Sequence, residues 1–171
     1  VNLPTSEVYT GLEKGVIDAA EWCCPKPDMV FGFQKVLKHY YLQGLHQVVV
    51  NADMYLNGDV WKSLTPHQQQ AMEIAADASL SRAMSWRIYE NGKALKELVE
   101  KHGVILHDTP ADYFNEYMEA ARKSLEKNAA ENAFFKKVWD SQKDFADIAV
   151  PFWAGAQTSN ANLGNAYANS K

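Results

Sequence analysis

One long stretch, from Thr65 to Gly103, constrains the fold of this chain more than any other feature. Thr65 and Pro66 are residue types that begin helices, and Gln68 completes the pattern of a capping box. No strong helix breaker follows before Gly103, so the sequence predicts a helix of about 35 to 40 residues, roughly 55 Å long. A single compact lobe of a chain this size is shorter than that.

The predicted helix therefore either kinks, near Ser79 and Ser81 or at Gly92, or spans two lobes of a larger fold. Strict heptads do not hold along it, which argues against a coiled coil. Its apolar positions still follow an approximate helical stripe, made of Ala71, Ala75, Ala78, Met84, Ile88, Leu95, Leu98 and Val99.

The composition is that of a globular chain of 171 residues with a net charge of -4. This charge argues against a nucleic-acid partner, because such proteins usually carry a basic stripe. No apolar run approaches the roughly 20 residues of a membrane-spanning helix. Residues 1–4 have neither the charged nor the apolar region of a signal peptide, and residue 1 is Val. We therefore expect a processed, trimmed or fragmentary chain.

A short apolar run, residues 15–22, is predicted to be a strand that delivers Glu21 and Trp22 side by side at its end. A carboxylate there can hold a cation or a hydroxyl, and an indole excludes water. A second strand is predicted over residues 46–57. Gln47 lies near the start of this strand and could add an amide oxygen to the site. Strand ends are where an α/β sheet forms its ligand crevice.

Cys23 and Cys24 are the only cysteines and are neighbours in the sequence. Neighbouring residues rarely form a disulfide with each other. We interpret the pair as two small residues in a tight segment before Pro25. A soft-metal site, redox chemistry or a cysteine-dependent enzyme stays open.

The other predicted elements are mainly helices. Apolar spacing predicts helices over residues 5–14, 29–43, 60–64, 110–127 and 132–150, and a short strand over 104–107. Val150-Pro151 is the expected end of the last helix. The tail after Gly155 is rich in Asn, Ala and Ser, so we expect it to be disordered.

Searches for catalytic and nucleotide-binding patterns find no Walker loop, GxGxxG, GxSxG, HExxH or CxxC sequence. The five histidines show no i, i+4 pairing suited to zinc. The sequence thus gives no positive support for an enzyme.

Residues 6–22, SEVYTGLEKGVIDAAEW, resemble the segment G-E-x-Y-x-A-L-x-x-G-x-I-D-A-x-E-W. That segment is typical of the substrate-binding proteins of tripartite ATP-independent periplasmic (TRAP) transporters, the DctP-like subunits. The likeness covers about residues 5–150 and includes His46-Gln47. It implies a partial, helix-rich α/β fold of the two-lobed periplasmic-binding-protein type, in which a long helix crosses both lobes.

The resemblance also implies a function and a site. The protein would capture an organic acid, such as a 2-oxo acid, a dicarboxylate or another carboxylate, for sodium-driven uptake by TRAP membrane subunits. It would work in the periplasm. Glu21, Trp22 and Gln47 would contact the substrate and a cation, Na⁺ or Ca²⁺, through the Glu21 carboxylate, the Trp22 backbone carbonyl and the Gln47 side chain.

The chain departs from the family pattern in two places. Cys23-Cys24-Pro25 follows the Glu-Trp pair where the family usually has an ordinary residue and Gly-Pro. Gln47-Val48-Val49 stands where many members have Glu-Pro-Gly. A divalent ion bound there would therefore have one carboxylate ligand fewer. Members are also longer, and the arginine that pairs with the substrate carboxylate lies upstream of the matching segment.

The chain therefore resembles the C-terminal half of such a protein. Residues 1–43 would belong to one lobe and 44–80 would cross to the other. Residues 81–155 would return with the long helix and the C-terminal helices, and 156–171 would form the disordered tail. The alternative is a truncated helical interaction protein that binds no ligand of its own. In either case, apolar faces left uncovered predict a homodimer or an exchanged oligomer through the C-terminal helix.

Overall fold

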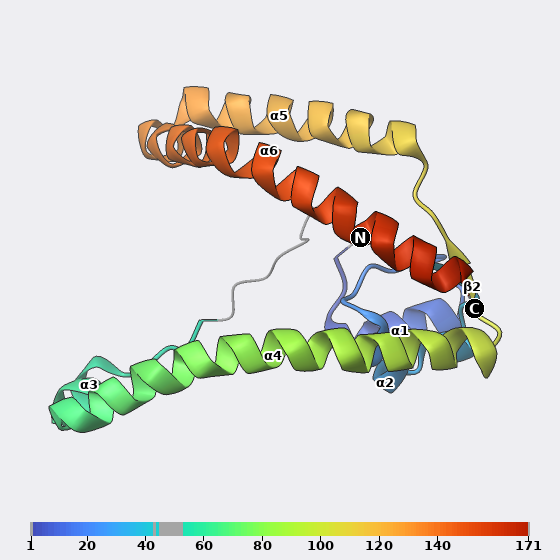
Figure 1. The fold of residues 1–171 in the computed structure, drawn as a ribbon, viewed down its shortest axis with the longest axis horizontal. Helices are drawn as coiled ribbons and strands as arrows, with labels where there is room; N and C mark the ends of the chain where they lie inside the picture. Colours follow the sequence, from blue (N-terminus) through green and yellow to red (C-terminus); the bar gives the residue numbers. More distant parts are fainter. Residues whose placement is uncertain (1, 43, 45–52, 171) are drawn as a thin grey trace. The chain divides into compact units, whose positions relative to one another are not determined.

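The computed structural model describes residues 2–42, 44 and 53–170. The chain divides into two compact units, Val1–Thr109 and Pro110–Lys171. Helices predominate in both (Figure 1). The first unit contains α1 (Thr5–Glu13), α2 (Pro25–Phe31), the 3₁₀ turn η1 (Phe33–Lys35), β1 (His39–Tyr41), α3 (Gly58–Ser63), α4 (Pro66–Glu100) and β2 (Ile105–His107). The second contains α5 (Ala111–Glu131) and α6 (Ala133–Asn169).

The predicted long helix is α4, a continuous helix of 35 residues. Its N-terminus has the predicted capping box: the Gln68 amide donates to Thr65 Oγ1 over 3.3 Å, and the Thr65 amide donates to Gln68 Oε1 over 2.9 Å. These two bonds satisfy donors that a helix start leaves without intrahelical partners. The helix runs through the three positions where a break was considered, Ser79, Ser81 and Gly92.

The strand predicted for residues 15–22 is wrong, because residues 16–22 have no regular secondary structure. Gly15 adopts a left-handed φ of 65° just after α1. The amides of Val16 and Ile17 then donate to the Gly11 carbonyl, over 2.8 and 3.3 Å. Backbone donors that a strand needs are therefore used to close the end of α1. The close approach also favours glycine at position 11, since an added Cβ would lie 3.3 Å from Ile17 Cγ1 and the isoleucine side chain would have to shift.

The helix predicted over residues 29–43 ends early. Gly32, with a φ of 85°, terminates α2 at Phe31, and the Gly32 amide donates to the Met29 carbonyl over 3.1 Å. The single turn η1 follows, and the chain then becomes β1. Helical spacing of apolar residues continued past Gly32, but the left-handed glycine redirects the backbone.

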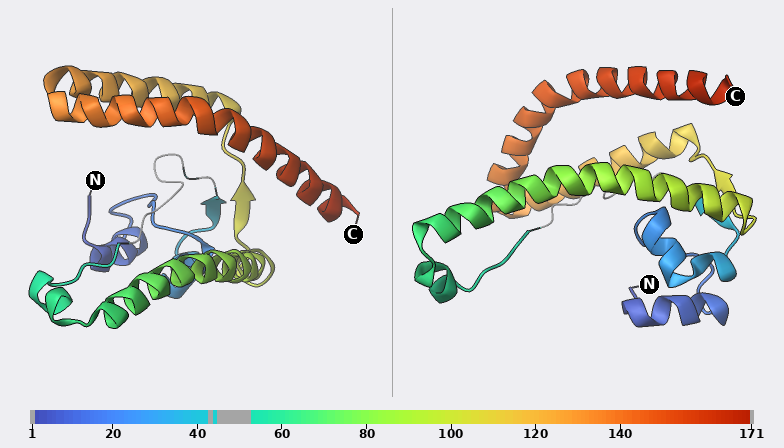
Figure 2. Two further views of the ribbon diagram at one scale, coloured as in Figure 1. Left: turned by 60° about the vertical axis from the view of Figure 1, so that its left-hand side comes forward. Right: turned by 60° about the horizontal axis from the view of Figure 1, so that its bottom comes forward.

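β1 and β2 form a parallel pair with His39 opposite Ile105 and Tyr41 opposite His107 (Figure 2). The predicted strand at 104–107 is thus confirmed. Most of the other predicted strand, residues 46–57, lies outside the described residues; 53–57 have no regular secondary structure.

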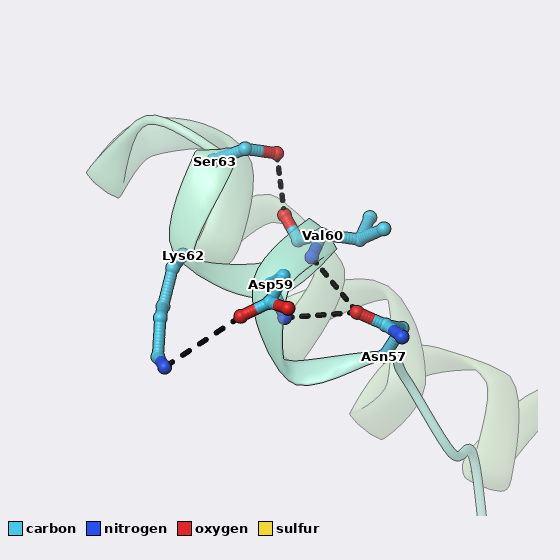
Figure 3. Close-up of polar contacts among 5 residues, drawn as sticks. All are labelled: Asn57, Asp59, Val60, Lys62 and Ser63. Carbon is cyan, nitrogen blue, oxygen red and sulfur yellow. Dashed lines mark hydrogen bonds and ion pairs between the residues drawn. The ribbon is translucent and has the colours of Figure 1, made fainter.

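The short helix α3, predicted over residues 60–64, begins two residues earlier, after an asparagine cap. Asn57 Oδ1 accepts from the amides of Asp59 and Val60, over 2.9 and 3.2 Å (Figure 3). Lys62 Nζ lies 3.8 Å from Asp59 Oδ1, and Ser63 Oγ donates to the Val60 carbonyl over 2.7 Å. These local bonds allow α3 to form although it buries no residue.

In the second unit, α5 and α6 lie side by side (Figure 1). The last helix does not end at Val150 and the tail is not irregular: α6 continues through Pro151 to Asn169. Pro151 removes one hydrogen bond of the helix, but the alanines that follow it have a high helix propensity, so the helix continues. The hydroxyl groups of Thr158 and Ser159 also bond back to carbonyls four residues earlier. None of the described helices combines the length and apolar character of a membrane span.

The core of the first unit is small: Val8 and Leu12 on α1 are buried, and so are residues at the C-terminal end of α4. Ala94 and Leu98 are buried there, together with Val104, and Figures 1 and 2 show α2 lying along this part of the helix. The Lys26 amide donates to Asn91 Oδ1 over 2.9 Å, which fixes α2 on α4. The rest of α4 leaves large apolar side chains exposed: Ile74, Leu80, Met84, Trp86, Ile88 and Tyr89.

Leu98→Ala should lower the free energy of unfolding by about 2–5 kcal/mol, because it opens a cavity in the core. Leu80→Ala is the matched control: the two leucines share α4, but Leu98 is 3% exposed and Leu80 73% exposed. We expect the control to change stability by less than about 0.5 kcal/mol. Urea unfolding followed by circular dichroism measures both, and equal effects would contradict this description of the core.

Candidate functional site

A cavity of about 400 Å³ lies in the first unit. Its walls come from four places: residues 18–23 after α1, Asp28 in α2, residues 33–42 with Gly44 around η1 and β1, and Leu98 with Val104 near the end of α4. Residues 18–22 also line a second hollow, together with Leu3 and Val8. The segment that the sequence singled out therefore separates two concave surfaces.

Trp22 is held in place by an aromatic cluster. Its indole meets the ring of Phe31 edge to face, with centroids 4.9 Å apart, and that of Phe33 at 6.2 Å. Such edge-to-face pairs fix orientation as well as burying apolar area. Glu21, next to it, lines the same cavity and is exposed. The structure thus brings two of the predicted site residues to one cavity, while Gln47 lies outside the described residues.

Asp28 is a site residue that the sequence did not single out. Its side chain is buried, at 8% exposure, and lines the cavity. Asp28 Oδ2 accepts a hydrogen bond from the Tyr40 hydroxyl over 2.7 Å, and Oδ1 accepts one from the Cys24 amide over 3.3 Å. The sequence predicted a helix over residues 29–43, which includes Tyr40 and follows Asp28, so nothing local indicated that these two residues meet.

Burial dominates the electrostatics of this pair. Desolvation raises the pKa of Asp28, while the hydrogen bonds from Tyr40 and from the amides of Cys24 and Cys23 oppose that rise. Desolvation and the bond to Asp28 also raise the pKa of the Tyr40 phenol. Tyr40 therefore stays a donor at neutral pH, and the cavity presents a phenol fixed on a buried carboxyl group.

The Cys23 thiol lines the cavity beside Trp22. Burial, followed by the contact with Cys24, raises its pKa to about 11. A reactive cysteine needs the thiolate form near neutral pH. Cys23 is therefore not activated as a nucleophile, which argues against a cysteine-dependent enzyme.

Two histidines that are far apart in the sequence meet on the sheet. His39 Nδ1 lies 2.8 Å from His107 Nε2, and the ring of Tyr41 stacks on His107 with centroids 5.0 Å apart. One imidazole must donate and the other accept, so at least one of the two rings is neutral. Across the described residues, no group of three or more His, Cys, Asp or Glu side chains gathers as a metal cluster.

Comparison with known proteins identifies the family. Residues 1–132 match the family of bacterial extracellular solute-binding proteins, family 7, also called DctP. The chain belongs to this family. Family 7 consists of transporter solute-binding proteins and is not a class of enzymes, and the membership predicted from residues 6–22 is confirmed.

The relatives of this family 7 chain include characterised and solved proteins. It is 32% identical over 148 residues to the monocarboxylate 2-oxoacid-binding periplasmic protein of Nostoc sp. (strain PCC 7120). The aligned region covers 84% of this chain and 39% of that protein. A TRAP solute-binding protein of Bordetella bronchiseptica RB50, a dimer with calcium and picolinate, matches with a TM-score of 0.81 at 24% identity, over 100% of this chain and 51% of that one.

A third relative is the TRAP periplasmic solute-binding protein of Pseudoalteromonas atlantica T6c, with bound sodium and pyruvate. It matches with a TM-score of 0.74 at 24% identity, over 95% of this chain and 49% of that one. These likenesses confirm the predicted fold class, a partial periplasmic-binding-protein fold rich in helices. The chain spans about half the length of the two solved proteins.

Asp28→Asn should make stability less dependent on pH. Because burial raises the pKa of Asp28 in the folded chain, its contribution to stability is fully present below the ordinary value of about 3.9 and is lost as the pH rises through the raised value. The asparagine variant lacks this loss, so the urea midpoint of the variant should rise relative to that of the wild type as the pH increases above about 4. Asp77→Asn, an exposed carboxylate on α4, is the control and should show no such trend.

Proposed function

We propose that this chain is part of a TRAP solute receptor that captures a small organic acid, in particular a 2-oxo monocarboxylate. The observation that carries the proposal is that Glu21 and Trp22, the pair at the end of the family segment, line one cavity. The identity to the Nostoc 2-oxoacid-binding protein supports the ligand class. The bound pyruvate and picolinate named for the two solved relatives are carboxylates as well.

Glu21, Trp22 and Gln47 take defined roles in this proposal. The Glu21 carboxylate, the Trp22 backbone carbonyl and the Gln47 amide oxygen are hard donors of the kind that Na⁺ and Ca²⁺ prefer. A cation held by them would bridge the protein and the carboxylate of the ligand. The indole of Trp22, fixed by Phe31 and Phe33, would cover the apolar side of the ligand.

Membership of family 7 supports a biological role in solute uptake. The receptor would bind its ligand in the periplasm and pass it to TRAP membrane subunits for sodium-driven uptake. Ligand would favour a closed arrangement of two lobes, because it contacts both only when they close. The assignment of residues 1–43, 44–80 and 81–155 to those lobes is part of this proposal.

The second candidate is a self-associating chain, and the apolar surface of α6 favours it. Phe145 and Ile148 lie three residues apart on one helix face and are 72% and 80% exposed.

For this candidate we expect sedimentation velocity to show an oligomer. The double variant Phe145→Ser with Ile148→Ser should be a monomer. Ser141→Ala is the control. Oligomers combined with no thermal shift across a panel of organic acids would favour this candidate over the receptor.

Glu21→Gln should weaken pyruvate binding about tenfold, which corresponds to about 1.4 kcal/mol, in the protein expressed from its complete gene. The variant keeps the size of the side chain and removes the charge that would hold the cation. Its affinity should also lose the dependence on sodium concentration that we expect of the wild type. Calorimetry measures both quantities.

Glu13→Gln is the matched control for this experiment, because Glu13 ends α1 and lines neither hollow. Unchanged affinity in Glu21→Gln would remove Glu21 from the site. The 171-residue chain alone should bind pyruvate weakly or not at all, since the resemblance places the anion-pairing arginine upstream of it. Micromolar binding by that chain would contradict this expectation.

A further inference from the structure

Cys23 and Cys24 are closer to each other than their places in the sequence require. Their sulfur atoms lie 2.8 Å apart, within the distance of an S–H···S contact in which either can donate. Both are free thiols, and the chain contains no third cysteine. Any disulfide within these 171 residues must therefore join the two neighbours.

The backbone on both sides of the pair is fixed by contacts. The Cys24 amide donates to Asp28 Oδ1 over 3.3 Å, and the Asp28 amide donates to the Cys24 carbonyl over 3.0 Å. Pro25, which is buried, follows directly and begins α2. On the other side, Trp22 is held against Phe31. Joining the two sulfurs in the folded chain therefore costs less conformational entropy than joining them in an unfolded chain.

We propose that Cys23 and Cys24 form a vicinal dithiol that closes reversibly into a disulfide at the edge of the cavity. The oxidant is a low-molecular-weight disulfide such as oxidised glutathione. One protein sulfur, through the small thiolate fraction that is present at equilibrium, attacks the glutathione disulfide and releases one glutathione thiolate. The neighbouring thiol loses its proton and attacks the mixed disulfide, which releases the second glutathione. Two protein thiols are oxidised, and one glutathione disulfide is reduced to two thiols.

The geometry makes this a reversible modification site and not a structural crosslink. Neighbouring Cα atoms are about 3.8 Å apart, whereas ordinary disulfides join Cα atoms about 4.4 to 6.8 Å apart. A ring between neighbours is therefore strained, and strained disulfides are readily reduced. Closure would stiffen the backbone directly after Glu21 and Trp22, so ligand binding would depend on the redox state. This last step alone rests on the proposed function.

The test compares ring closure in the folded and the unfolded chain. The wild-type chain is equilibrated over a series of ratios of oxidised to reduced glutathione, quenched with acid and weighed by intact mass spectrometry. We expect a monomer that has lost two hydrogen atoms and carries no glutathione. The same series in guanidinium should require a roughly tenfold more oxidising mixture, equivalent to about 30 mV for this two-electron couple.

Cys23→Ser and Cys24→Ser are the controls, and each should carry a single glutathione where the wild type carries none. Folded wild type that holds one or two glutathiones, or a covalent dimer, at every ratio would overturn the proposal. So would equal closure in the folded and the unfolded chain. Failure to bind pyruvate in either redox state would contradict the proposed function and leave the ring-closure result unchanged.

Discussion

The packing of Ala94 and Leu98 at the C-terminal end of α4 is the contact on which the first unit depends. It fixes α2 against the helix, and Gly103 then turns the chain so that buried Val104 leads into β2. Leu98 and Val104 are at the same time walls of the cavity. The small core and the candidate site therefore share these two residues, so a substitution that loosens the core also changes the shape of the cavity.

Asp28 connects the parts of the site that lie far apart in the sequence. Its two oxygens accept hydrogen bonds from β1, through Tyr40, and from the start of α2, through the Cys24 amide. A buried carboxyl group is costly unless such donors surround it. Through these two bonds, Asp28 connects β1 with the start of α2 and the neighbouring cysteine pair.

Local signals in the sequence predicted α4, its capping box and β2 because the chemistry of each lies within a few residues. They failed where a distant atom or a single glycine decided the outcome. The amides of Val16 and Ile17 bond to Gly11, so no strand forms there, and Gly32 ends α2 although the apolar spacing continues. At the candidate site, Glu21 and Trp22 were predicted as the end of a strand that does not form, and again through the family resemblance. Asp28 and Tyr40 were not, since their meeting depends on the tertiary fold.

The parallel pair of β1 and β2 also has a kinetic consequence. His39 and His107, which meet across it, are 68 positions apart, and the long helix α4 occupies much of the chain between them. Helices form within about a microsecond, whereas pairing of distant strands must first close a long loop. We therefore expect the pairing of β1 with β2, which also brings together walls of the cavity, to form more slowly than α4.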